Sequence, residues 1–454
     1  MARPTLHFTP TQNWMNDPNG FIFYKGEYHL FYQHFPYDTK WGTMHWGHKT
    51  SGDLLHWEDR GIALYPSKCY DANGCFSGSA LEVDGKMYLY YTAIVYDKIN
   101  PEDITVSAAG LLASQAMLVS EDGYGFDQSQ KRMVVPQFSV IAAGEENPAF
   151  SYGDSGNVRD PKVWKHGDTY YMILGSQHPD STGTMRGELL FYTSGDAIHW
   201  SFANVYRSGE IRTEMFECPD LFEVDGQTVF ITSPFGEECS GNYKDHAWYT
   251  TGTFSHENCD LQLDPNLKLI DCGMDFYAPQ TTTDEAGRRT IVGWLRMPEA
   301  LCDDSGKKWI GAYTFPRLVE VREGRICFPP HPNVKKAFSR ETDRFSANKP
   351  MRISILAQNG ARIHVGGFDI AVENGIVQTD RSKVFGDFPN IGTVFQTPRI
   401  CEASEEIALE IYVDDCIVEV YVNDGEYVIS NICYGLNDEF YCIGADCKMY
   451  VGES

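Results

Sequence analysis

Short apolar segments, each ended by a tight turn, follow one another along the whole chain. Tyr, Phe, Val, Ile and Thr alternate with polar residues over a few positions, and Gly or Asp-Gly then interrupts the run. No long stretch has the 3.6-residue period of an amphipathic helix. The pattern therefore predicts an all-β protein built from hairpins.

Five of these segments repeat one design, in which an apolar strand meets a Gly turn and a Tyr- or Ile-rich strand returns. They are residues 20–33 (GFIFYKGEYHLFYQ), 78–92 (GSALEVDGKMYLYYT), 160–175 (DPKVWKHGDTYYMILG), 219–232 (PDLFEVDGQTVFIT) and 278–294 (APQTTTDEAGRRTIVGW). Their turn glycines, Gly26, Gly85, Gly167, Gly226 and Gly287, are separated by 59, 82, 59 and 61 residues. This spacing suits blades of four strands and predicts a five-bladed β-propeller.

A second, partial repeat supports the propeller. Residues 49–57 (KTSGDLLHW) and 192–200 (YTSGDAIHW) match almost residue for residue, and each falls later in its own unit. The alternative is a set of unrelated hairpins in a sandwich, which the regular spacing disfavours.

The repeat stops after residues 327–334 (CFPPHPNV), and a new alternating pattern follows. Residues 409–430 (LEIYVDDCIVEVYVNDGEYVIS) contain strands joined at Asp414-Asp415 and a hairpin at Asn423-Asp424-Gly425, as in a β-sandwich. We therefore expect a propeller domain over residues 1–335 and a C-terminal β-sandwich over residues 345–454.

Composition and charge narrow the possible partners. The 454 residues are 42% hydrophobic and carry a formal charge of −26, which disfavours nucleic acid and anionic membrane surfaces as partners. The N-terminus lacks a signal-peptide profile and no run of about 18 apolar residues occurs, so we expect a cytoplasmic protein. The 13 cysteines are odd in number, form no CxxC pair and are expected to be reduced thiols without a structural zinc ion. A homo-oligomer remains possible.

Acidic residues recur at one position of the repeat. The first strands of propeller blades surround the central axis, so residues just before them should converge. Asp17, Asp160, Glu217 and Asp275 stand at or near that position. Each alone could be an ordinary turn or surface residue, but four together predict a shared acidic site, and paired carboxylates are the groups that glycoside hydrolysis requires.

Seven motifs occur in a fixed order along the chain: WMNDPNG, FYQHFP, WGTMHWGH, GCFSGSA, RDP, FECPD and DFYAPQ. In these motifs and their order the chain resembles glycoside hydrolase family 32, with its invertases, fructanases and sucrose-6-phosphate hydrolases. The resemblance implies that Asp17 is a nucleophile, Glu217 an acid/base and Asp160 a stabiliser of the transition state. It implies a retaining reaction through a covalent fructosyl-enzyme, with carboxylates about 5 to 5.5 Å apart.

The resemblance also implies a set of substrate-binding residues and a substrate class. The predicted contacts to the sugar are Asn16, Gln33, Trp41, Phe76, Ser77, Arg159, Asp275 and Trp294. The expected substrates are sucrose and short fructo-oligosaccharides; sucrose 6-phosphate, larger fructans and fructosyl transfer are the alternatives. A phosphorylated substrate would need a nearby cation, for which Lys40, Arg186 and Arg212 are candidates.

No cofactor or metal is expected, because a proton assists departure of the leaving group. His45 and His48 lack a third ligand at suitable spacing, which favours a structural role in the first blade. The second repeat unit is about twenty residues longer than the others. We expect its additional loops, residues 95–110 and 138–153, to surround the pocket.

Overall fold

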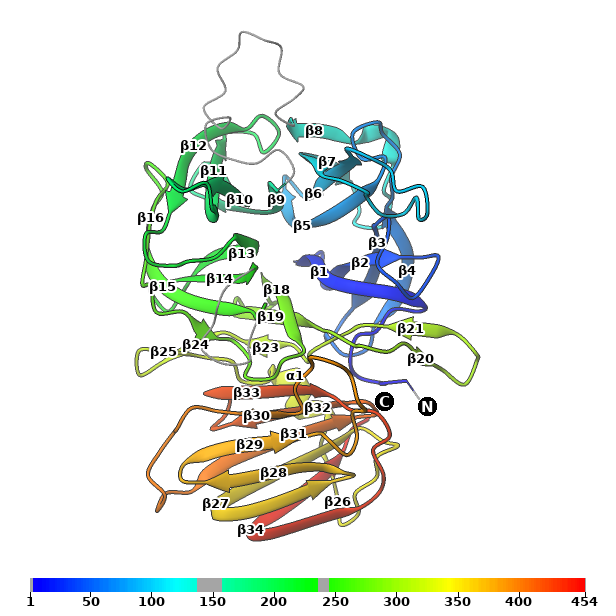
Figure 1. Cartoon of the computed structure of the whole chain (residues 1–454), viewed down its shortest axis with the longest axis vertical. Helices are drawn as coiled ribbons and strands as arrows, with labels where there is room; N and C mark the ends of the chain where they lie inside the picture. The colour runs from blue at the N-terminus through cyan, green and yellow to red at the C-terminus, as the bar shows by residue number, and fades with distance from the viewer. Residues whose placement is uncertain (1–2, 137–156, 236–244, 454) are drawn as a thin grey trace.

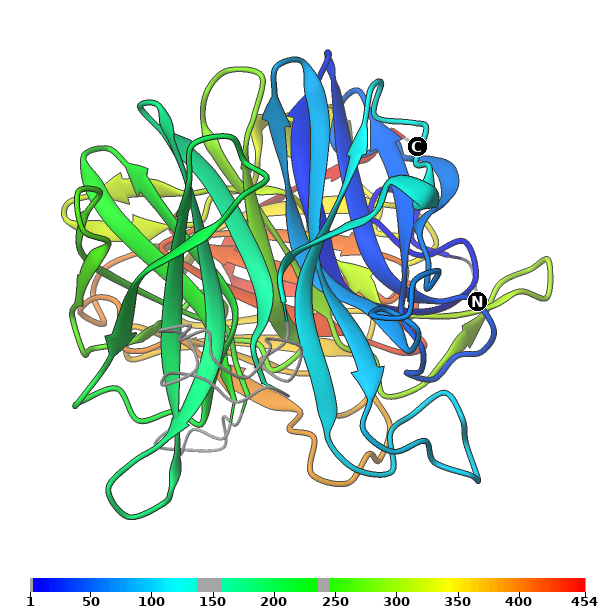
Figure 2. The same ribbon diagram turned by 90° about the horizontal axis from the view of Figure 1, so that it is seen from above.

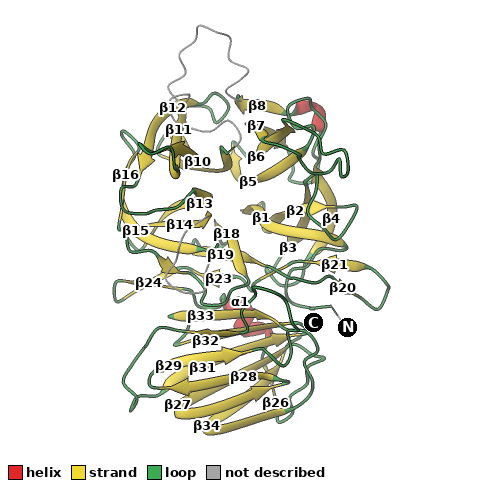
Figure 3. Ribbon diagram, viewed as in Figure 1, coloured by secondary structure: helices red, strands yellow, loops and turns green. Residues whose placement is uncertain are grey.

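The computed structural model describes residues 3–136, 157–235 and 245–453, and it confirms the predicted all-β architecture. A five-bladed β-propeller is followed by a β-sandwich (Figures 1 and 3). Figure 2 shows the sandwich, in orange and red, behind the blades. No helix in the described ranges is long and apolar enough to cross a membrane.

Each of the first four blades is an antiparallel sheet whose strands follow chain order from the axis outward, and the fifth is shorter. The first blade comprises β1 (Asn13–Tyr24), β2 (Glu27–Phe35), β3 (His45–Ser51) and β4 (Glu58–Leu64), and the second comprises β5 (Gly74–Val83), β6 (Lys86–Tyr96), β7 (Leu111–Ser120) and β8 (Arg132–Val135), with the 3-10 turn η1 (Gln128–Gln130) before β8. The third blade comprises β9 (Arg159–His166), β10 (Thr169–Pro179), β11 (Met185–Ser194) and β12 (Ser201–Arg207), and the fourth comprises β13 (Met215–Val224), β14 (Gln227–Phe235), β15 (Trp248–Ser255), β16 (Asp260–Leu263) and β17 (Lys268–Leu269). The fifth blade comprises β18 (Phe276–Thr283), β19 (Arg289–Leu295), β22 (Ala312–Tyr313) and β23 (Arg317–Leu318).

The chain closes the propeller by returning to its first blade. After the fifth blade has begun, β20 (Leu301–Cys302) and β21 (Lys308–Ile310) extend to the first sheet, where β21 pairs in parallel with the start of β1. Figure 1 looks along the axis, with β1, β5, β9, β13 and β18 around the centre. Contacts between neighbouring inner strands complete the ring.

The predicted turn glycines all lie in the hairpins between the first two strands of their blades. Their φ angles are +90°, +75°, +60°, +75° and +80° in chain order. Only glycine adopts this left-handed backbone without a steric penalty, so these positions set the register of each inner hairpin. The partial repeat is confirmed as well, because Asp53 bonds His56 and Asp196 bonds His199, both at 2.7 Å.

A belt of side chains joins the blades around the axis, one from each inner strand. Lys162 binds Asp220 at 2.7 Å, and Asp220 accepts a hydrogen bond from the Thr281 hydroxyl at 2.7 Å. The Gln280 amide donates to the Gly78 carbonyl at 2.8 Å. The belt consists of Asn19, Ser79, Lys162, Asp220 and Gln280. These bonds fix the relative positions of the inner strands that carry the site.

The sandwich is built on one long strand, β27, which pairs with β28, β31 and β34. Its nine strands are β26 (Arg340–Thr342), β27 (Met351–Val365), β28 (Phe368–Glu373), β29 (Ile376–Asp380), β30 (Val394–Gln396), β31 (Ile407–Asp414), β32 (Ile417–Val422), β33 (Tyr427–Ile432) and β34 (Phe440–Val451). The two predicted junctions fall between β31 and β32 and between β32 and β33. A continuous apolar core fills the domain.

The connection between the domains contains a ribbon and a short helix. The ribbon is formed by β24 (Glu320–Arg322) and β25 (Arg325–Cys327), and α1 (Pro332–Ala337) follows it. Because β26 already pairs with β34, we propose that the sandwich begins near residue 340 rather than at residue 345.

Buried ion pairs hold the sandwich against the propeller. Arg317 of β23 is fully buried and binds Glu419 of β32 at 2.6 Å and Asp271 at 2.8 Å. Arg381, which follows β29, is also fully buried and binds Asp275 beside β18. Since a buried charge that loses its partner is costly, these pairs fix how the two domains dock.

Candidate active site

Every inner strand is irregular at the same level of the propeller. The pairing register shifts between Met15 and Pro18, Phe76 and Gly78, Arg159 and Lys162, Glu217 and Asp220, and Tyr277 and Gln280. Such β-bulges re-aim side chains that a regular strand would point to one face of its sheet. We predicted that the acids lie just before the inner strands, but in the structure they lie in bulges within these strands.

Proline explains where four of the bulges form. Pro18, Pro161, Pro219 and Pro279 follow the bulged residue, and proline has no N–H to give to a sheet ladder. In three cases the preceding residue has a positive φ, +65° at Asp160, +46° at Cys218 and +47° at Ala278. This backbone is uncommon for residues other than glycine, and such strain is concentrated at functional sites.

The bulges place two consecutive residues of each blade at one level around the axis. The ten residues are Asn16, Asp17, Phe76, Ser77, Arg159, Asp160, Glu217, Cys218, Tyr277 and Ala278. The sequence alignment assigned Asp275 to this level in the fifth blade. That assignment was out of register, because Tyr277 occupies the place equivalent to Glu217.

Asp17 is surrounded by hydrogen-bond donors from three blades. Ser77 Oγ donates to its Oδ2 at 2.6 Å, Asn16 Nδ2 to its Oδ1 at 3.2 Å, and Cys218 Sγ lies 3.6 Å from Oδ2. Burial raises the pKa of Asp17, the Ser77 bond opposes this, and the charge of Glu217 raises the pKa further. The donors therefore hold the carboxylate charge in a place that would otherwise disfavour it.

Asp160 lies next to Asp17 across the Cys218 side chain. The Cys218 amide donates to Asp160 Oδ2 at 2.9 Å, and the Cys218 sulfur is 3.7 Å from the same oxygen. Burial raises the pKa of Asp160 to about 7; Arg159 opposes the rise, and the charges of Glu217 and Asp17 add to it. Burial also raises the pKa of Cys218 well above its usual value, so the thiol keeps its proton between the two carboxylates.

Glu217 is held by one donor on each oxygen. Arg159 Nη2 donates to Oε1 at 2.6 Å, and the Tyr277 hydroxyl donates to Oε2 at 2.5 Å. Arg159 Nη1 is fixed in turn by Asn157 at 2.8 Å, and its Nε lies 4.0 Å from Asp160. Burial lowers the pKa of Arg159, but Glu217 and Asp160 outweigh this and raise it. Arg159 thus links two of the three carboxylates.

Aromatic rings flank the carboxylates in two groups. Trp41 meets Phe76 edge to face at 5.7 Å between centroids. Trp294 contacts Trp14 at 6.0 Å and Tyr277 at 6.5 Å, and the Trp14 indole donates to Asn16 at 2.7 Å. Flat apolar faces next to polar groups are the surfaces on which sugar rings pack.

Two predicted sugar contacts have other partners. The Gln33 amide is buried and donates to the Cys75 carbonyl at 3.0 Å, which joins the first blade to the second next to Phe76. Asp275 is 3% exposed; Arg381 binds both of its oxygens and the Ile432 amide donates to it at 2.7 Å. We therefore assign Asp275 to the contact with the sandwich.

The loop that follows β6 approaches the Trp41 side of the site. Within it, Asp103 pairs with Lys40, next to Trp41, and the Thr105 carbonyl accepts a bond from Tyr96 at 2.6 Å. The second additional loop, residues 138–153, lies outside the described residues. His45 and His48 make contacts within the first blade, where His48 Nε2 lies 3.0 Å from the His29 ring nitrogen.

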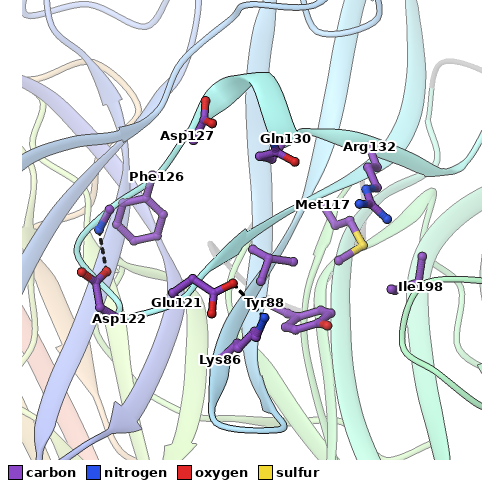
Figure 4. A pocket seen from close by; sticks show the side chains of 12 residues that line it. Lys86, Tyr88, Met117, Glu121, Asp122, Phe126, Asp127, Gln130, Arg132 and Ile198 are labelled. Atoms are coloured by element: carbon purple, nitrogen blue, oxygen red, sulfur yellow. Dashed lines mark hydrogen bonds and ion pairs between the residues drawn. The ribbon is translucent and has the colours of Figure 1, made fainter.

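Among the described residues, large cavities lie away from the carboxylates, and two of them border the blades. One of about 480 Å³ is lined by the inner strands beyond the belt, including Phe21, Trp164, Phe222 and Arg289. The other, about 770 Å³, is lined by the second blade and by Ile198 of the third, and Lys86 binds Glu121 at 2.8 Å in it (Figure 4). Neither contains one of the three acids in its lining.

The comparisons with known proteins agree with this geometry. The model described as "Glycosyl hydrolases family 32 N-terminal domain" matches residues 7–330, and the one described as "Glycosyl hydrolases family 32 C terminal" matches residues 336–442. The chain belongs to glycosyl hydrolase family 32. It is accordingly a glycoside hydrolase, as the sequence motifs predicted.

Three relatives illustrate the membership. The chain is 31% identical over 461 residues to a sucrose-6-phosphate hydrolase of Bacillus subtilis, covering 94% of this chain and 88% of the relative. It is 30% identical over 451 residues to a raffinose invertase of Escherichia coli, with 95% and 89% covered. A β-fructofuranosidase of Bombyx mori, solved as a mutant in complex with sucrose, superimposes with a TM-score of 0.78 at 29% identity, covering 99% and 93%.

Two features of the site were missed in the sequence. The Cys218 thiol between Asp17 and Asp160 and the Tyr277 hydroxyl on Glu217 were not among the predicted site residues. Extending the repeat alignment by the x-Pro step that follows each bulge would have found both, since Cys218-Pro219 and Ala278-Pro279 match Asp17-Pro18 and Asp160-Pro161.

Proposed function

We propose that this family 32 enzyme is a β-fructofuranosidase that hydrolyses terminal β-D-fructofuranosyl residues of sucrose and short fructo-oligosaccharides with retention of configuration. The observation that carries the proposal is the convergence of three carboxylates, each with different donors. The sucrose bound to the Bombyx mori relative supports the substrate class.

In the first step, an oxygen of Asp17 attacks the anomeric C2 of the fructosyl unit. The C2–O bond to the leaving sugar breaks, and the glycosidic oxygen takes a proton from Glu217. The donors Ser77 and Asn16 keep the attacking carboxylate oriented, and its raised pKa makes it more basic than an exposed aspartate. A covalent fructosyl ester results.

In the second step, Glu217 takes a proton from water, whose oxygen attacks C2 and displaces Asp17. Tyr277 and Arg159 hold the two Glu217 oxygens in place throughout, so the same group can give and regain a proton. We assign Asp160 two roles: it binds the fructose hydroxyls, and it stabilises the positive charge that develops on the ring. We expect Asn16, Trp41, Phe76, Ser77, Arg159 and Trp294 to complete the fructose subsite.

Sucrose-6-phosphate hydrolysis is the second candidate, because the Bacillus subtilis relative carries that name. Fructan hydrolysis and fructosyl transfer remain alternatives for the same chemistry. No cofactor is included in this proposal. A cytoplasmic location remains a prediction.

Initial rates on sucrose, sucrose 6-phosphate, 1-kestose, inulin and levan at matched concentrations test the proposal. We expect Asp17→Asn and Glu217→Gln to abolish fructose release from every substrate, and NMR to detect the β anomer first. Undiminished release by these variants would overturn the residue assignment, and prompt appearance of the α anomer would overturn the double displacement.

A further inference from the structure

Arg296 is held beside the acid/base by contacts from three directions. It follows the last residue of β19, and its guanidinium carbon lies 4.8 Å from the centroid of the Tyr277 ring. Its Nη2 donates to the Met274 carbonyl at 2.5 Å, and its backbone amide donates to the Asp275 carbonyl at 2.9 Å. The side chain therefore has a fixed position next to the Tyr277–Glu217 hydrogen bond.

Among the described residues, the Arg296 guanidinium has few hydrogen-bond partners. Of its five N–H donors, only those on Nη2 have a partner among the described residues, and no described carboxylate lies within 4.0 Å. The Arg296 side chain is half-buried. In contrast, Arg317 and Arg381 are fully buried in carboxylate pairs.

Of the three cations that the sequence suggested for a phosphate, two are already paired, and the third, Arg212, is exposed. Lys40 binds Asp103, and Arg186 binds Asp180 at 3.1 Å. Neither residue contacts a member of the carboxylate cluster. Arg296 instead contacts Tyr277, whose hydroxyl bonds Glu217 at 2.5 Å.

The place of Arg296 in the reaction follows from the role of Glu217. A general acid lies beside the oxygen that leaves, so the leaving sugar is on the Glu217 side of the site, whereas fructose is on the Asp17 side. The Tyr277 hydroxyl donates to Glu217 Oε2, whereas Arg159 donates to Oε1. Because the Arg296 guanidinium packs over the Tyr277 ring, we assign it to the same side of the site as the leaving sugar.

We propose that Arg296 is a specificity-determining residue that binds a phosphate monoester on the leaving hexose, as in sucrose 6-phosphate. This inference rests on the proposed fructosidase function and refines its substrate. A guanidinium matches phosphate oxygens with two parallel hydrogen bonds. In a chain of net charge −26, a phosphorylated substrate requires such a local cation, because the overall field repels it.

The test compares sucrose 6-phosphate with sucrose for the wild-type enzyme, Arg296→Met and Arg296→Lys. A lost charge-assisted pair lowers affinity about 10- to 100-fold. We expect Arg296→Met to lose that much kcat/KM on sucrose 6-phosphate while its kcat/KM on sucrose changes less than about threefold, with Arg296→Lys between them. Arg186→Met removes one charge elsewhere and serves as the matched control, with both ratios unchanged.

Product binding separates this proposal from the proposed function. Calorimetry should find that the wild-type enzyme binds glucose 6-phosphate more tightly than glucose, and that Arg296→Met removes the difference. Equal losses on both substrates, a wild-type enzyme that does not prefer the phosphorylated ligand, or an Arg186→Met variant that loses the preference would each overturn the role of Arg296. Failure to hydrolyse either substrate would refute the fructosidase function instead, while glucose 6-phosphate binding would still report on Arg296.

Discussion

Replacing Asp160 by asparagine should make the folded protein more stable at alkaline pH while it lowers activity. Burial, with the charges of Glu217 and Asp17, raises the pKa of Asp160 from 3.8 to about 7. A carboxyl whose folded-state pKa is raised stabilises the folded protein only below its unfolded pKa, and this contribution is lost as pH rises through the folded value. Between pH 4 and pH 7, ionisation of Asp160 therefore lowers the free energy of unfolding increasingly.

The size of the effect follows from these two pKa values. Linkage gives a cost of about 1.7 kcal/mol at pH 5 and about 4.3 kcal/mol at pH 8. Asparagine has no such titration, and its side-chain oxygen can still accept the bond from the Cys218 amide. We expect the free energy of unfolding of Asp160→Asn, relative to wild type, to rise by about 2.6 kcal/mol between pH 5 and pH 8.

Urea unfolding of both proteins at pH 5, 6, 7 and 8 measures this difference. Asp180→Asn is the matched control, because hydrogen bonds from Thr182 lower the pKa of Asp180 and it stays ionised over the whole range in both states. Its difference from wild type should not change with pH. A pH-independent difference for Asp160→Asn, or one that falls toward pH 8, would refute the claim that the site holds this charge at the expense of stability.

Three further predictions concern groups that hold the site in place. Ser77→Ala removes the 2.6 Å bond to Asp17 and should lower kcat on sucrose about 10- to 100-fold, with the acidic limb of the pH–rate profile moved to higher pH; an unchanged profile would contradict the contact. Tyr277→Phe removes the donor to Glu217 Oε2 and should lower kcat about tenfold or more without changing the circular dichroism spectrum, whereas a loss confined to KM would assign Tyr277 to binding alone. Arg381→Leu leaves Asp275 buried without its partner and should destabilise the protein to urea by about 3 to 5 kcal/mol, more than Arg381→Lys; equal stability of the two variants would show that the ion pair does not hold the domains together.

The fold was predictable because its signals are local and repeated. A glycine with positive φ marks the inner hairpin of each blade, and these five positions could be aligned by eye. The alternation in residues 409–430 likewise identified three strands of the sandwich, since the period of two reflects burial of one face. The start of the sandwich was less accessible, because β26 has only three residues and pairs with the distant β34.

The site was predictable only as far as the repeat could be aligned. Asp17, Asp160 and Glu217 come together as expected, but the bulges that aim them depend on register shifts that sequence spacing does not reveal. For the same reason, the sequence analysis assigned Asp275 to the position of the fifth blade that Tyr277 occupies in the structure. Asp275 is acidic for a different reason, namely its ion pair with Arg381, which lies 106 residues away in the sandwich.

The central claim is that Asp17 becomes covalently bonded to the fructosyl unit. Rapid acid quenching of the wild-type enzyme during turnover of sucrose, followed by digestion with pepsin and mass spectrometry, tests this directly. The account predicts a fructosyl ester on the peptide that contains Asp17, absent from Asp17→Asn. An adduct on another residue, or no adduct together with α-fructose as the first product, would contradict it.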